Sequence, residues 1–169
     1  MKLKNLAVGS ALMVVAAVIA FASLKANFAG EWTMDKSKSE GLPPEMAQTM
    51  TVVQDGDKVS IETTVINGDQ KQSIKDNYLL DGSAQDFAPQ ANTPEGVITG
   101  KGKRNAKWND DGKGFVVSDE AKFESPEGEI TVTTVRKWAL ADDGKTLLIE
   151  INSKTPNGER ITKRTFNRK

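Results

Sequence analysis

Six Asn-Gly and Asp-Gly pairs punctuate the chain, and each stands between segments in which apolar and polar residues alternate. They are Asp55-Gly56, Asn67-Gly68, Asp81-Gly82, Asp111-Gly112, Asp143-Gly144 and Asn157-Gly158. Tight hairpin turns need positive φ at their central residues, a conformation that Asn, Asp and Gly adopt with little strain. The repetition therefore predicts an antiparallel meander. Closing that meander into a barrel is the simplest way to hide its edge strands.

The first residues have a different composition. Lys2 and Lys4 precede an apolar stretch from Leu6 to Leu24, and Ala20-Phe21-Ala22 fits the small-x-small rule for signal peptidase. This predicts a signal peptide over residues 1–22 and export to the periplasm or the cell exterior. The alternative is an uncleaved membrane anchor, because the stretch approaches the ~20 residues of a membrane span. Residues 23–169 then form one domain of 169 − 22 = 147 residues, enough for a single core.

The composition excludes several chemistries. The chain has no His and no Cys, which removes the Ser-His-Asp triad, the usual zinc ligands and thiol catalysis. The acidic pairs Asp110-Asp111, Asp119-Glu120 and Asp142-Asp143 are interpreted as residues in or near turns, and no metal-loop spacing appears. We expect no cofactor and no metal. Without residues 1–22 the charge is 23 − 2 = 21 basic against 23 acidic residues, which argues against a nucleic-acid partner.

The alternation predicts an all-β domain, a single up-and-down barrel of about eight to ten strands. Residues 35–47 are expected to form an ordered loop with one helical turn, and residues 83–95, with Pro89 and Pro94, a flexible flap or a solvated connector. Gly100 and Gly102 would let one long strand bend and leave room inside the barrel. The expected strands are 28–34, 48–54, 58–66, 70–80, 97–108, 114–124, 129–140, 145–154 and 160–168.

Residues at the two ends of the domain predict how the barrel closes. Gly30 and Trp32 suit a strand that enters a barrel floor, where Gly30 permits a tight bend and the indole fills the closed end. The first and last strands of a closed barrel are neighbours. An arginine of the last strand, Arg164 or else Arg168, is therefore expected to lie across Trp32, with Phe166 beside it.

This combination resembles the calycin superfamily of lipocalins and fatty-acid-binding proteins, whose first strand carries Gly-x-Trp and whose last strand carries an arginine that packs on the Trp. Arg164 and Phe166 look like the Arg-x-aromatic ending of fatty-acid-binding proteins. The chain also looks like small secreted bacterial lipocalin-like proteins, with Lys38-Ser39 after the Trp and Phe166-Asn167-Arg168-Lys169 at the end. The resemblance implies a barrel that holds a small hydrophobic or amphipathic molecule.

Strand parity nominates interior residues that could contact such a ligand. Arg136 and Trp138 share a parity with apolar neighbours, Arg104 and Trp108 share another, and Tyr78 follows Ile74 in a third strand. An interior arginine often binds a carboxylate or phosphate. The alternatives are that these arginines lie at the rim or pair with acidic residues of neighbouring strands, and that the Trp residues only fill the core.

Three functional hypotheses follow. The first is a non-enzymatic barrel that binds a small apolar or amphipathic ligand inside. The second is a filled barrel whose outer face, or the 83–95 segment, binds another envelope protein or a polymer. The third is a calycin-type isomerase or hydratase that uses Asp, Glu or Tyr78. The sequence leaves the oligomeric state open.

Overall fold

Twelve strands follow one another in the computed structural model, which describes residues 25–93, 96–126 and 128–169. The predicted signal peptide lies outside these residues, so it stays a prediction. Within them, the 3-10 turn η1 (Lys36–Lys38) is the helical element, and no helix is long and apolar enough to span a membrane. The strands are β1 (Gly30–Met34), β2 (Ala47–Asp55), β3 (Lys58–Asn67), β4 (Gln70–Leu79), β5 (Asp81–Phe87), β6 (Gln90–Thr93), β7 (Gly96–Thr99), β8 (Lys101–Trp108), β9 (Gly114–Ser125), β10 (Gly128–Leu140), β11 (Thr146–Thr155) and β12 (Gly158–Arg168).

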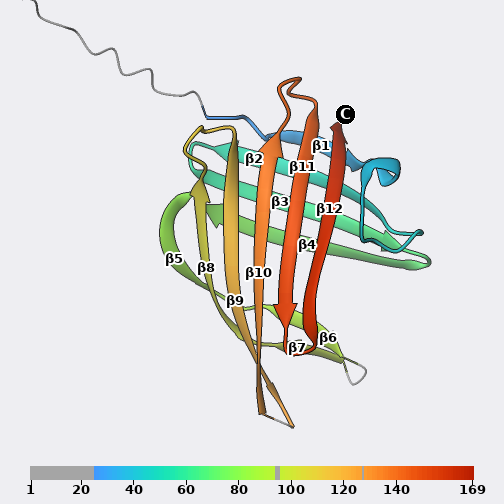
Figure 1. Cartoon of the computed structure of the whole chain (residues 1–169), viewed down its shortest axis with the longest axis vertical. Helices are drawn as coiled ribbons and strands as arrows, with labels where there is room; N and C mark the ends of the chain where they lie inside the picture. The colour runs from blue at the N-terminus through green and yellow to red at the C-terminus, as the bar shows by residue number, and fades with distance from the viewer. Residues whose placement is uncertain (1–24, 94–95, 127) are drawn as a thin grey trace, which may run out of the picture.

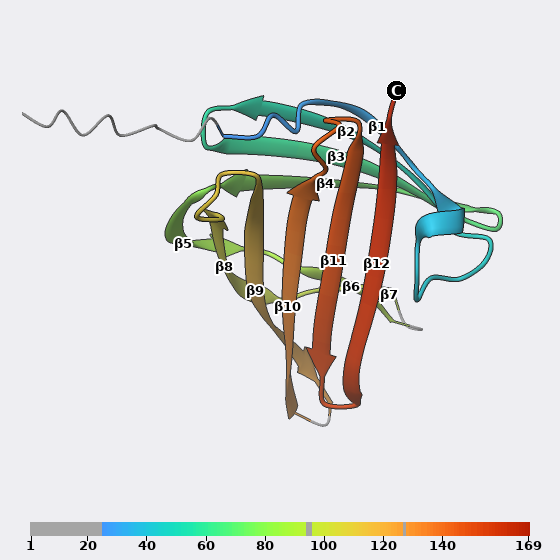
Figure 2. The same ribbon diagram turned by 45° about the horizontal axis from the view of Figure 1, so that its top comes forward.

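Ten of these strands form one antiparallel sheet in the order β4-β3-β2-β1-β12-β11-β10-β9-β8-β5. β1 pairs with β12, and Trp32 stands opposite Arg168, so the two ends of the chain close the sheet on one side. Figures 1 and 2 show β1–β4 crossing over β8–β12, which gives a nearly closed barrel, while β6 and β7 form a separate ribbon. The predicted all-β antiparallel barrel and its closure by the terminal strands are confirmed.

The turns differ from the prediction in one respect, namely which residue adopts positive φ. Among the described residues only glycines have positive φ, and the Asn or Asp of each pair does not. In the β2–β3 hairpin Asp55 is still paired with Lys58, and Gly56 (φ 58°) is the first of two loop residues. Glycine reaches this region without a Cβ clash, so it alone supplies the left-handed residue.

Three predicted segments differ from the structure. Asp81-Gly82 closes no hairpin: it lies in β5, where the register with β8 shifts between Asp81 and Ala84. Most of the supposed flap 83–95 forms β5 and β6, although Pro94 and Glu95 lie outside the described residues. The expected strand 97–108 is divided at Gly100 into β7, which pairs with β6, and β8, which pairs with β5 and β9.

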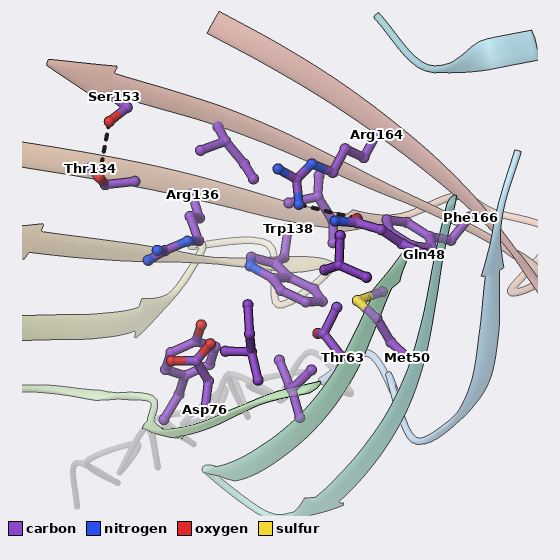
Figure 3. A pocket seen from close by; sticks show the side chains of 16 residues that line it. Gln48, Met50, Thr63, Asp76, Thr134, Arg136, Trp138, Ser153, Arg164 and Phe166 are labelled. Atoms are coloured by element: carbon purple, nitrogen blue, oxygen red, sulfur yellow. Dashed lines mark hydrogen bonds between the residues drawn. The ribbon is translucent and has the colours of Figure 1, made fainter. Parts of the chain in front are cut away.

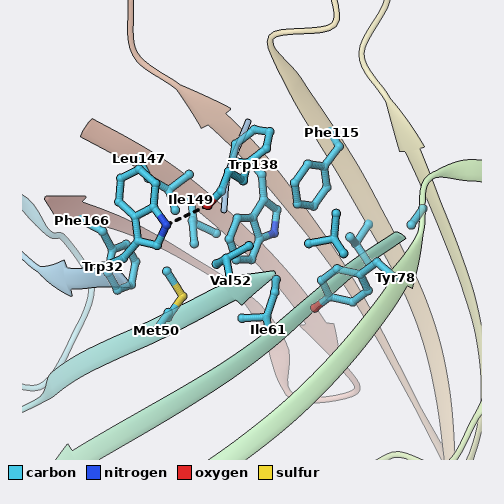
Figure 4. Close-up of a cluster of buried hydrophobic side chains, with 14 of the residues drawn as sticks. Trp32, Met50, Val52, Ile61, Tyr78, Phe115, Trp138, Leu147, Ile149 and Phe166 are labelled. Carbon is cyan, nitrogen blue, oxygen red and sulfur yellow. Dashed lines mark hydrogen bonds between the residues drawn. The ribbon is translucent and has the colours of Figure 1, made fainter. Parts of the chain in front are cut away.

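The core lies at the closed end of the barrel, where aromatic side chains from distant strands meet (Figure 4). Phe28, Trp32, Phe115 and Phe166 are fully buried. The Trp32 indole donates to Phe28 O at 2.9 Å, and Phe115 stacks on Trp138 with ring centroids 5.1 Å apart. Burying a side chain of this size contributes roughly 1.5–3 kcal/mol. This packed floor seals one end of the barrel and leaves space beyond it.

Candidate functional site

A cavity of about 350 Å³ opens above the aromatic floor, between β2–β4 on one side and β10–β12 on the other (Figure 3). Its lining is apolar near the floor and carries charged and hydroxyl groups along its walls. Side chains alternate across a strand, so each strand sends every second residue inward. The lining residues are Gln48, Met50, Ile61, Thr63, Val65, Ile74, Asp76, Tyr78, Thr134, Arg136, Trp138, Ile149, Ile151, Ser153, Arg164 and Phe166.

Arg164 projects from β12 into this cavity, and none of the acidic residues in the described part of the chain forms an ion pair with it. Its Nη1 donates to Gln48 Oε1 at 3.1 Å, and its buried Nε has no hydrogen-bond partner among the described residues. Burial, together with the charges of Arg136 and Arg160, lowers the pKa of Arg164 to about 10. The guanidinium is still charged at neutral pH, so an unneutralised cation stands in the cavity wall.

The other interior arginines are neutralised. Asp119, in the middle of β9, accepts from Arg104 Nε at 2.7 Å and Nη2 at 2.9 Å, and from Arg136 Nη1. Arg104 Nη1 also donates to Asp76 of β4 at 3.0 Å. Burial alone would raise the pKa of Asp119, but the hydrogen bonds from Arg104 and the charge of Arg136 lower it overall. Asp119 therefore stays ionised between two guanidinium groups.

The formal charges of the interior sum to a positive value. Arg104, Arg136 and Arg164 supply three positive charges, and Asp76 and Asp119 supply two negative ones, so 3 − 2 leaves one. Within the described part of the chain no cluster of three acidic residues could hold a metal ion. The arrangement favours an anion inside the barrel.

Tyr78 and Trp138 line the cavity, as expected from their parity. Burial raises the pKa of the Tyr78 hydroxyl well above its ordinary value, so it stays neutral and is a poor candidate for a base. The guanidinium of Arg104 lies over the Tyr78 ring, 4.8 Å from its centroid. The Trp138 Nε1 is buried and has no partner among the described residues, which makes it a second unused donor in the lining.

The remaining residues predicted from the sequence differ in whether they line the cavity. Arg136 lines the cavity, whereas Arg104 stands behind it and forms the ion pairs that the alternative interpretation anticipated. Trp108 does not line the cavity. It lies beneath the floor, with its ring 6.0 Å from Phe115, and its Nε1 donates to Asp57 Oδ1 at 2.8 Å.

The preferred assignment of Arg164 to barrel closure was wrong. Arg168 lies over Trp32 instead, with its guanidinium carbon 4.4 Å from the ring centroid. Gly30 packs closely against this arginine. A Cβ added at Gly30 would lie 3.1 Å from Arg168 Nη1. Phe166 belongs both to the core and to the cavity lining.

Sequence reasoning missed Asp119, Asp76 and Gln48. Asp119 was interpreted as a turn residue, yet it lies mid-strand and pairs with Thr134 of β10. Its parity with Phe115 and Val117 was a signal for an inward position. Gln48 likewise shares parity with Met50 and Val52, which are buried in β2.

Comparison with known proteins gives a distant likeness in fold. No protein-family model matches the chain, and no curated protein matches it. One similar solved structure is the REP1-NXSQ fatty acid transporter, with 15% sequence identity, a TM-score of 0.47, and coverage of 83% of this chain and 95% of that one. Another is the zebrafish ileal bile acid-binding protein complexed with cholic acid, with 13% identity, a TM-score of 0.45, and coverage of 84% and 98%. Likenesses this low support no functional assignment.

Proposed function

We propose that the barrel binds one small amphipathic anion in its interior, with the anionic group at Arg164 and the apolar part against the aromatic floor. The observation that carries the proposal is the unneutralised Arg164 guanidinium in the cavity wall. Burying a charge costs several kcal/mol unless it is paired. A bound carboxylate or similar group would supply the missing partner.

The size and lining of the cavity fit a ligand of this kind. Its volume of about 350 Å³ lies at the small end of the roughly 300–1,000 Å³ that ligand sites span. Met50, Ile61 and Ile149 offer apolar surface to a hydrocarbon part. The planar fork of Arg164 suits a carboxylate, because two parallel N–H groups can donate to its two oxygens.

The test compares decanoate with decanol, which have the same chain and differ in the charge of the head group. Arg164→Leu should weaken decanoate binding about 10- to 100-fold, the value of a hydrogen bond to a charged group. The affinity of Arg164→Leu for decanol should not fall. Isothermal titration calorimetry measures both.

Lys163→Leu is the matched control, because Lys163 directly precedes Arg164 in β12 and its side chain points outward to Glu40. This variant should bind decanoate as the unchanged protein does. Equal decanoate affinity in Arg164→Leu and Lys163→Leu would contradict the proposal, as would the failure of decanoate to bind at all.

A further inference from the structure

The barrel has an opening in its side wall. β4 and β5 are the two end strands of the ten-stranded sheet, and no strand pairing joins them. A second cavity of about 520 Å³, here called the side slot, lies between β4 and the segment from Phe87 to Gln90. Unpaired strand edges are normally covered or paired. The slot lies where the edges of β4 and β5 are left unpaired.

Phe87 lines the slot and packs on β8, where it is paired with Gly102. Its ring lies against Gly102, where an added Cβ would come within 2.3 Å of the ring, and 4.4 Å from the Arg104 guanidinium carbon. Because Gly102 has no side chain, the ring can lie flat on β8. The room that Gly102 was expected to leave inside the barrel is thus taken by Phe87.

The side slot adjoins the main cavity. Ile74, Asp76 and Arg136 line both. A ligand bound at Arg164 with its chain along the main cavity therefore has a lateral path toward the slot.

The slot offers neutral polar groups rather than free charges. Its charged residues are paired: Asp76 with Arg104, Arg136 with Asp119, and Lys75 with Glu62 at 3.5 Å. Gln72 and Gln90 add amide groups to its lining. This chemistry suits a hydroxyl or an amide better than a second anion.

We propose that the side slot is a second subsite for the same ligand and receives a neutral polar group at the end remote from the anion. The ligand class is then a long-chain acid that carries a hydroxyl or amide at its far end. The inference rests on the proposed function, since the slot receives the far end of a molecule held at Arg164.

The test uses three probes at concentrations where they are monomeric: decanoate, hexadecanoate and ω-hydroxyhexadecanoate. The protein should bind the ω-hydroxy acid about fivefold more tightly than hexadecanoate, the value of one net hydrogen bond. Ala88→Trp places a large ring at an exposed position in the slot lining, where it should fill the slot without disturbing the core. This variant should lose the fivefold preference and keep its affinity for decanoate.

Ala84→Trp is the matched control, because Ala84 is exposed on β5 and does not line the slot. It should keep the preference. Decanoate binding without a preference for the ω-hydroxy acid, or a preference that survives Ala88→Trp, would overturn the subsite and leave the proposed function standing. Failure of all three probes, decanoate included, would overturn both.

Discussion

At the scale of single residues, Asp119 determines whether the interior charges are tolerated. It is 7% exposed, and it accepts hydrogen bonds from both Arg104 and Arg136. Removing one partner of a buried ion pair leaves an uncompensated charge, which costs more than the pair was worth. Here a single carboxylate serves two guanidinium groups, so its loss would affect both.

Asp119→Asn should lower the free energy of unfolding by about 3–5 kcal/mol, measured by urea denaturation at neutral pH. Asp142→Asn is the control, because Asp142 forms an exposed pair with Lys113 and its substitution should change stability by about 0.5 kcal/mol or less.

The stabilising effect of Asp119 should depend on pH, because its folded-state pKa lies below its ordinary 3.8. Its contribution is therefore present above pH 3.8 and is lost as the pH falls through the lower folded value. The stabilities of Asp119→Asn and of the unchanged protein should converge below that pH. Equal stability of these two proteins at neutral pH would contradict the role given to Asp119.

The arginines show what single residues reveal from sequence. Parity placed Arg136 and Trp138 inward correctly, because the β9–β10–β11 ladders run without a bulge over these residues. Parity could not choose between Arg164 and Arg168, which share a face of β12. Four residues apart on a strand, they stand about 13 Å from each other. The register between β1 and β12 settles the question: Arg168 lies opposite Trp32 and closes the barrel, whereas Arg164 lies in the cavity.

At the scale of elements, one side chain of β12 holds the segment that leads into β1. Arg168 of β12 donates through Nε to Gly144 O at 3.0 Å, and through Nη2 to Asn27 O at 2.9 Å. Its Nη1 donates to Ala29 O. One guanidinium thus joins the last strand to the residues that lead into the first.

Arg168→Lys should lower stability by about 1–3 kcal/mol, because an ammonium cannot reach all three carbonyls and stack on Trp32 as a planar fork does. Amide hydrogen exchange in β1 should quicken, and β9–β10 should change less. Arg160→Lys provides the same substitution on the same strand at an exposed position. Unchanged exchange in β1 of the Arg168→Lys protein would show that strand pairing alone closes the barrel.

Eight expected strands, which became β1–β4 and β9–β12, differ from the observed bounds by two residues or fewer. In most of them one face is buried, so apolar and polar residues must alternate along the strand. The 83–95 segment failed because its strands are half exposed and carry little hydrophobic signal. β5 and β6 are stabilised by pairing with β8 and β7, which the local sequence does not encode.

At the scale of the whole molecule, closure of the barrel followed from the sequence but the cavity did not. Turn pairs and terminal residues predict that the ends meet. Whether the interior is filled depends on which inward side chains lie at the same height on facing strands. Large rings gather in the floor around Phe115, and smaller residues such as Thr63 and Thr134 face the space above it. That layering appears only once every register is known.

The unpaired cation inside the barrel should lower the stability of the empty protein and strengthen its binding of an anion. Without a ligand, Arg164→Leu should raise the free energy of unfolding by about 1 kcal/mol, because it removes a partly buried charge that no acid of the described residues neutralises. Decanoate at a hundredfold excess over its Kd should stabilise the unchanged protein by about 2.7 kcal/mol. At the same concentration it should stabilise the variant by about 1.4 kcal/mol or less, because the variant binds 10- to 100-fold more weakly.

The order of the two midpoints in thermal unfolding should therefore reverse when decanoate is added, with Lys163→Leu following the unchanged protein in both conditions. A variant that is less stable than the unchanged protein without ligand would mean that Arg164 already has its stabilising partners in the empty barrel. The cation would then be part of the scaffold, and the reason for an anionic ligand would be lost.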